Sequence, residues 1–204
     1  MVSADLARLW ADLLPGSSTL GAELLSRWGE PHRRYHDHGH LADVLDALQR
    51  LSEVERPPTR EERLALWFHD AIHTGTPGQD ERRSAELAAS RLPDAGLGRM
   101  ATDEVVRLVL VTIHHRPDPG DLPGARVSDA DLSVLGADAA RYRSSVAALR
   151  AEAAVSEAAW RESRLARVAV LRATVPLFHT PAGRDLWQAR AEANLQAEYR
   201  LLTE

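Results

Sequence analysis

Apolar residues recur at the three- and four-residue spacing of an α-helix along almost the whole chain of 204 residues. This periodicity predicts an all-α fold. A loop containing Pro and Gly over 116–126 is expected to lead into an element that opens at Ser128–Asp131. The helices expected from the pattern cover, in order, residues 3–14, 18–28, 39–56, 60–73, 79–92, 99–115, 138–154, 157–177 and 182–203.

Two of these helices carry further local signals. Thr59 stands directly before the fourth helix and Glu62 follows three residues later, which is the pattern of a capping box. The same helix is apolar nearly all round at 64–68, so it is expected in the middle of the domain. The Val-rich run 105–111 has the composition of a buried strand, but no partner strand is evident, and a helix is expected there.

Length and composition favour one compact domain over residues 1–204. A net charge of −5 gives no electrostatic footprint for nucleic acid or for an anionic membrane. The chain has no Cys, which excludes thiol nucleophiles and thiolate metal sites, and no Lys, which excludes a Walker-type phosphate loop and Schiff-base chemistry. The N-terminus lacks a signal-peptide pattern and no segment reaches the ~18 apolar residues of a membrane span, so a cytoplasmic protein is expected.

Ionisable residues on the inward side of the expected helices are the main clue to function. His40 shares a helical stripe with Val44, the pair His69 and Asp70 ends the most apolar helix, and Asp131 precedes two apolar residues by three and four positions. Buried charges are unfavourable unless they are paired or bound to a metal. A shared divalent cation would explain all four residues together.

Each residue also has an ordinary structural explanation. A lone buried His is more often a hydrogen-bonded core residue than a ligand, and a lone Asp before a helix is usually a cap. Asp129 fits the capping role better than Asp131 does. The adjacent pair His69 and Asp70 is harder to explain in this way, because consecutive side chains on a helix diverge by about 100° and can flank one ion.

The order His, His-Asp, Asp resembles the signature of the HD-domain superfamily of metal-dependent phosphohydrolases, and a bacterial family of predicted metal-dependent HD phosphohydrolases in particular. The similarity covers about residues 20 to 200. It is carried by the segments Tyr35–His40, Leu66–Asp70, Glu81–Ala85, Thr112–His115, Asp129–Gly136 and Ala191–Leu195.

This resemblance implies metal ligands at His40, His69, Asp70 and Asp131, with Asp131 preferred to Asp129. The metal set is intact, whereas residues expected to face the substrate depart from the family pattern. The departures are Asp37 in place of Asn, His73 in place of Tyr, Gln79–Glu81 in place of Asp-Asn-Glu, Ser163-Arg164 in place of Gly-Arg, and Glu192 in place of Arg.

The expected chemistry is attack of a metal-activated water on a phosphorylated small molecule such as a nucleotide. The mixed His and Asp set suits one divalent ion of Mn, Fe, Co, Ni or Mg. Asp70 is expected to orient the water and Glu81 to transfer a proton, although Glu81 also suits the first turn of a surface helix. The residues expected to contact substrate are Arg34, His36, His73 and His115, and Arg33, Arg82 and Arg83 are further candidates for binding phosphate.

Two other functions stay open at this point. Mixed-valent di-iron oxygenases share the fold but need further His ligands between the His-Asp pair and the last Asp; His73, His114 and His115 are the available ones, without the usual spacing. A non-catalytic module would bind metal or nucleotide without turnover. Neither membrane nor nucleic acid is expected as a partner, and a homo-oligomer is compatible with the sequence.

Overall fold

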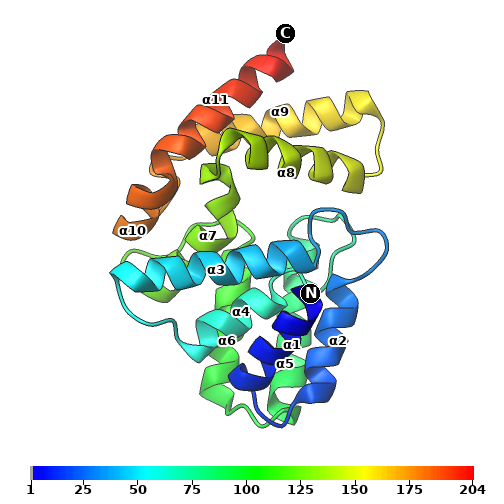
Figure 1. Cartoon of the computed structure of the whole chain (residues 1–204), viewed down its shortest axis with the longest axis vertical. Coiled ribbons are helices and arrows are strands. Elements are labelled where there is room, and N and C mark those ends of the chain that lie inside the picture. Colours follow the sequence, from blue (N-terminus) through cyan, green and yellow to red (C-terminus); the bar gives the residue numbers. More distant parts are fainter. Residues whose placement is uncertain (1) are drawn as a thin grey trace.

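The computed structural model describes residues 2–204, and every regular element in that range is helical (Figure 1). The predicted all-α fold is confirmed. The elements are α1 (Val2–Leu13), α2 (Ser18–Trp28), α3 (His38–Val54), α4 (Arg60–Phe68), α5 (Gln79–Asp94), α6 (Arg99–Val111), α7 (Leu122–Asp131), the 3-10 helix η1 (Leu132–Gly136), α8 (Ala139–Glu152), α9 (Glu157–Ala173), α10 (Pro181–Gly183), the π-helical turn η2 (Arg184–Gln188) and α11 (Ala189–Thr203).

Helices α1–α7 form an N-terminal layer with α4 at its centre, where it contacts α3, α6 and α7. Its apolar residues 64–68 are all buried, as the sequence predicts. The predicted capping box is also present. The Thr59 side chain accepts from the Glu62 N–H, and the Glu62 carboxylate accepts from the Thr59 N–H at 2.7 Å.

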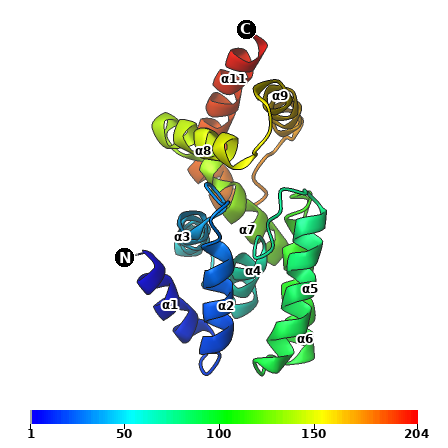
Figure 2. The same cartoon turned by 90° about the vertical axis from the view of Figure 1, so that its right-hand side faces the viewer.

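The elements from η1 to α11 form a C-terminal layer, which stands on the side of the N-terminal layer formed by α3 and α7 (Figures 1 and 2). A buried polar cluster joins its helices. Arg164 on α9 donates to the Glu198 carboxylate on α11 at 2.7 Å, and the Tyr142 hydroxyl on α8 donates to the same carboxylate. The two layers meet around α3, α7 and η1.

The start of α7 differs most from the prediction. The expected loop ends at Asp121, whose side chain accepts from the Gly124 N–H at 3.0 Å and so caps the helix. Pro123 occupies the first helical turn, where its missing N–H removes no hydrogen bond. Asp131 therefore ends a helix, and the prediction that a new element opens at 128–131 was wrong.

Three predicted helices are shorter than expected. α4 ends at Phe68 instead of near 73, because the chain turns at the His-Asp pair. α6 ends at Val111, and α9 ends at Ala173, shortly before Pro176, which disfavours the helical conformation at the residue before it. Within residues 2–204, no helix combines the length and the apolar surface that crossing a bilayer requires.

Candidate metal centre

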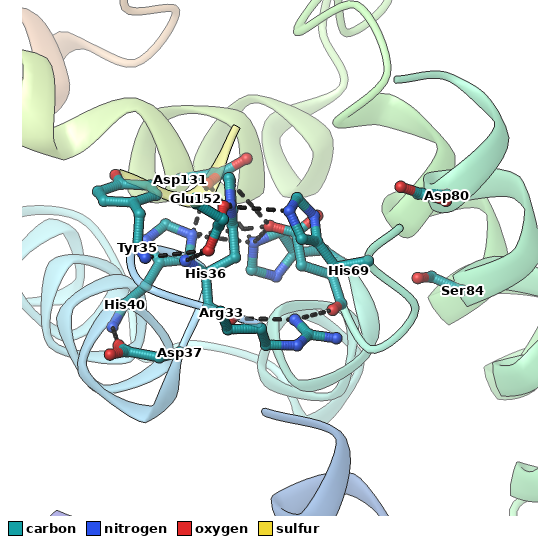
Figure 3. Close-up of polar contacts among 12 residues, drawn as sticks. Arg33, Tyr35, His36, Asp37, His40, His69, Asp80, Ser84, Asp131 and Glu152 are labelled. Carbon is teal, nitrogen blue, oxygen red and sulfur yellow. Dashed lines mark hydrogen bonds and ion pairs between the residues drawn. The ribbon is translucent and has the colours of Figure 1, made fainter. Parts of the chain in front are cut away.

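His40 lies in the first turn of α3, and the local sequence directs its imidazole inward. The Asp37 side chain caps this helix by accepting from the Gly39 N–H at 2.8 Å and from the His40 N–H at 3.3 Å (Figure 3). His40 is 5% exposed, on the same stripe as the buried Val44. The prediction that His40 faces the core is confirmed.

His69 and Asp70 follow directly after the last residue of α4. The His69 Nδ1 lies 2.8 Å from the Leu66 carbonyl oxygen, and a carbonyl can only accept, so the proton of the neutral ring is on Nδ1. The Nε2 lone pair is left to face the neighbouring donors. A ring nitrogen that donates to a backbone carbonyl is the usual means of orienting a metal-binding imidazole.

The four predicted ligand residues converge at the junction of α3, α4 and α7. The Nε2 atoms of His40 and His69 lie 3.3 Å apart. Asp70 Oδ2 lies 3.2 Å from the His69 Nε2 and 3.9 Å from the His40 Nε2. Asp131 Oδ1 lies 3.3 Å from the His40 Nε2 and 3.5 Å from the His69 Nε2. Residues up to 91 positions apart in the chain thus bring two carboxylates against the same pair of imidazoles.

This donor set fits a divalent cation. The Nε2 atoms of His40 and His69 face each other at 3.3 Å, so they either share a proton in a hydrogen bond or both direct their lone pairs at a cation between them. Both carboxylates would offset the charge of such an ion. Four protein ligands leave about two positions of an octahedral shell open, as in sites that bind a water and a substrate oxygen.

The electrostatics of the metal-free cluster show what an ion would replace. Burial lowers the pKa of His69, but the carboxylates of Asp70 and Asp131 outweigh this effect and hold its pKa well above the usual value. Burial raises the pKa of both carboxyl groups, and His69 more than offsets it, so that both pKa values lie below the usual range. A proton on His69 therefore supplies the positive charge that a metal ion would supply instead.

A cavity of about 460 Å³ opens beside this cluster, between the two layers. Asp70 and Asp131 line one end of it. The C-terminal layer supplies apolar side chains, including Leu149 and Trp160, and two cations, Arg164 and Arg167. Such a volume is in the range of small-molecule sites.

Of these two cations, only Arg167 is free to meet a ligand. Arg164 is bound by Glu198, whereas Arg167 makes no ion pair within 4 Å among residues 2–204. Sequence reasoning did not single out Arg167, because nothing distinguishes it from the other Arg residues of the chain.

A second cluster of ligand-type side chains lies next to the first. His36 and His73, both predicted to contact substrate, line the cavity. Glu152, from the end of α8, reaches between them: its Oε1 lies 3.1 Å from the His73 Nε2 and hydrogen-bonds with the His36 Nδ1. Sequence reasoning missed Glu152, which lies 116 residues from His36 and follows no apolar stripe.

The other predicted site residues occupy different environments. Glu81 lines the cavity, and its carboxylate accepts from the Gly78 N–H at the start of α5, which matches its ordinary role in a first turn. His115 also lines the cavity, with its Nε2 3.7 Å from the Asp131 Oδ2. The Arg34 guanidinium is exposed and donates to the carbonyls of Pro31 and Arg33, so it does not face the cavity in this structure.

Arg33 is buried and serves the scaffold. It donates to the carbonyl oxygens of His36 and Asp70 at 2.9 and 2.8 Å, which ties the segment before α3 to the turn after α4. Asp129 is also buried, and its carboxylate accepts from the backbone N–H groups of His179 and Thr180 at 2.7 and 2.8 Å. Asp129 is therefore occupied within the fold, whereas Asp131 faces the imidazoles of His40 and His69.

Comparisons of the chain with family models, with curated proteins and with solved structures found no match. The resemblance to HD phosphohydrolases therefore rests on the sequence motifs alone. The grouping of the four donor atoms rests on their geometry, and any functional conclusion has to start from that site.

Proposed function

We propose that this protein is a metal-dependent phosphohydrolase that acts on a phosphorylated small molecule such as a nucleotide. One observation carries the proposal: the carboxylates of Asp70 and Asp131 each lie 3.2–3.9 Å from the Nε2 atoms of His40 and His69, which are 3.3 Å apart, beside an open cavity. The order and types of these residues also resemble those of the HD-domain superfamily.

A bound divalent ion would polarise a phosphate oxygen and lower the pKa of a coordinated water. The side chains of the protein supply the remaining functions. Asp70, which lines the cavity, is placed to accept a hydrogen bond from that water. Arg167 would offset the charge of the phosphate, and the apolar wall from the C-terminal layer would hold the organic part of the substrate.

Phosphate release by the full chain tests the proposal. A panel of nucleotides and sugar phosphates would be incubated with the protein, with and without Mn²⁺, and inorganic phosphate and bound metal would be measured. We expect phosphate release that depends on the metal. Substitution Asp70→Asn should lower the rate by about a hundredfold or more, because it removes a charged ligand.

Asp46→Asn is the matched control, because Asp46 is 61% exposed and pairs only with Arg50. It should leave the rate unchanged, and circular dichroism should show equal helical content for both variants. Metal binding without phosphate release from any substrate would favour a non-catalytic module. Two bound irons together with oxygen uptake would favour a di-iron oxygenase and contradict the proposal.

A further inference from the structure

The side chains of His36, His73 and Glu152 form a second convergent donor set that the proposed function does not use. One ligand atom from each residue lies within 4.8 Å of the other two. The side chains are 21%, 14% and 6% exposed, so all three are largely shielded from solvent. The set joins the N-terminal layer, which supplies both imidazoles, to α8 of the C-terminal layer.

The carboxylate of Glu152 is held as a single-oxygen ligand would be. Its Oε2 accepts from three consecutive backbone N–H groups, those of Arg34, Tyr35 and His36, at 2.8, 3.0 and 3.0 Å. These bonds fix the carboxylate and leave Oε1 directed at the two imidazoles (Figure 3). Hydrogen bonds to the outer oxygen of a carboxylate are a common second shell around a metal.

The two nitrogens of His36 face different partners. Nδ1 faces Glu152 Oε1, and Nε2 lies 3.8 Å from the Asp70 Oδ2 of the first centre. A ring that binds a metal through Nδ1 carries its proton on Nε2, directed at Asp70. At 3.8 Å this contact is too long for a hydrogen bond, so the charge of Asp70 favours that tautomer without fixing the ring.

From this geometry we propose that His36, His73 and Glu152 bind a second divalent transition-metal ion beside the first centre. Two imidazoles and one Glu form the ligand set of catalytic zinc sites, in which the fourth position stays open. Here that position would face the cavity, because His36 and His73 both line it. The ligands come from before the His-Asp pair, from just after it and from beyond Asp131, unlike the di-iron arrangement considered from the sequence.

The alternative is a hydrogen-bonded triad without metal, in which Glu152 accepts from both rings. Metal stoichiometry separates the two. The full chain would be stripped with a chelator and dialysed against Zn²⁺, and bound zinc would be measured by mass spectrometry. We expect two zinc ions per chain in the wild type, one in His73→Gln, and one in Asp131→Asn, which disrupts only the first centre.

His114→Gln is the matched control, since His114 is exposed, and it should keep two ions. Circular dichroism would confirm that each variant is folded. Replacement of Zn²⁺ by Co²⁺ gives a second readout, because four-coordinate cobalt absorbs strongly in the visible range. His73→Gln should lose that band and Asp131→Asn should keep it.

One ion per chain in the wild type overturns the second site. So does a folded His73→Gln protein that keeps two ions or loses both, because the four donors of the first centre are untouched in that variant. The number of bound ions tests the second site without reference to the proposed phosphohydrolase activity. A chain that binds two ions but releases no phosphate contradicts the hydrolase alone, whereas phosphate release with one ion contradicts the second site alone.

Discussion

The His115 imidazole lines the cavity and is largely buried. Its backbone adopts a φ of 51°, its Nδ1 lies 3.3 Å from the Ser128 hydroxyl, and its side chain is 11% exposed. Burial is the main cause that lowers the pKa of His115, to about 4, although the attraction of Asp131 opposes the shift. The ring is therefore neutral in the folded protein at pH 7.

We expect this burial to make the metal-free protein less stable in acid. Because the folded pKa of about 4 lies below the unfolded value, the unfolded state binds more protons between pH 6.5 and 4. The contribution of His115 to the free energy of unfolding is therefore fully present above pH 6.5 and is lost as the pH falls toward 4. Between pH 7.5 and 5 the loss should be about 2 kcal/mol.

Urea unfolding of the wild type and of His115→Asn at both pH values would measure this effect. Asn tolerates a positive φ and does not titrate, so its pH dependence should be weaker by that amount. Ionisable groups that do not interact with His115 contribute equally to both proteins and cancel in the difference. Equal losses of stability in the two proteins would contradict the prediction.

The sequence identifies His40, His69, Asp70 and Asp131 because each stands next to a readable apolar stripe or ends a buried helix. Their side chains were therefore expected to face the interior, where an ionised group needs an ion-pair partner or a bound metal. Glu152 could not be found in the same way. Its partners are three backbone N–H groups and the His36 imidazole, all at least 116 residues away, and the imidazole of His73, and no local pattern encodes such contacts.

At the scale of elements, α7 carries Asp131 and is anchored by a fully buried Arg126. The Nη1 of Arg126 lies 2.9 Å from Glu55 and its Nη2 2.7 Å from Ser52, both near the end of α3. Its Nε lies 3.2 Å from the Glu62 carboxylate at the start of α4, without hydrogen-bond geometry. One guanidinium thus ties together the three helices that lead to the metal ligands.

We expect Arg126→Met to destabilise the fold by about 3 kcal/mol, because it removes the cation that pairs with Glu55 and leaves the fully buried Glu62 paired with Arg56 alone. Arg107→Met is the control: Arg107 also binds two carboxylates, those of Glu104 and Asp121, but its side chain is 43% exposed. That substitution should cost less than about 1 kcal/mol. Chemical denaturation measures both changes, and comparable losses in the two variants would refute the assigned role of Arg126.

The start of α7 also shows where element-scale prediction fails. Pro and Gly between two periodic segments favour a loop, yet Asp121 and Pro123 are equally suited to begin a helix. The choice depends on the buried contacts of Arg126 with α3 and α4, which a linear pattern does not contain. Helices with a continuous apolar stripe, such as α2, were placed correctly because their packing follows from their own sequence.

At the scale of the whole molecule, the proposed activity depends on the position of the C-terminal layer, because this layer supplies one wall of the cavity beside the metal centre. Within this layer, α11 is fixed to η1, which continues directly from α7, through three consecutive carbonyls: Leu135 and Ala137 accept from Asn194, both at 2.9 Å, and Gly136 accepts from Arg190 at 2.8 Å. The sequence predicted the helices of this layer but not its position, because these bonds connect side chains to distant backbone groups.

Gly136 allows the closest approach at this joint. A Cβ atom added there would lie 2.4–2.7 Å from the Cβ, Cα and carbonyl oxygen of Trp187, and most of that contact is with backbone, which cannot rotate away. Gly136→Ala should therefore push η2 and α11 outward and destabilise the protein by about 1–3 kcal/mol. The ligands of the first metal centre all lie in α3–α7 and the turns between them, so that centre should survive the change.

The expected result is a separation of two measurements. Gly136→Ala should keep the ion of the first centre but release phosphate more slowly, because the walls of the cavity at Leu149, Trp160 and Arg167 move with the C-terminal layer. Gly98→Ala is the control, since a Cβ there has open space around it. A Gly136→Ala protein with a lowered melting temperature but unchanged turnover would show that the position of the C-terminal layer does not limit the reaction.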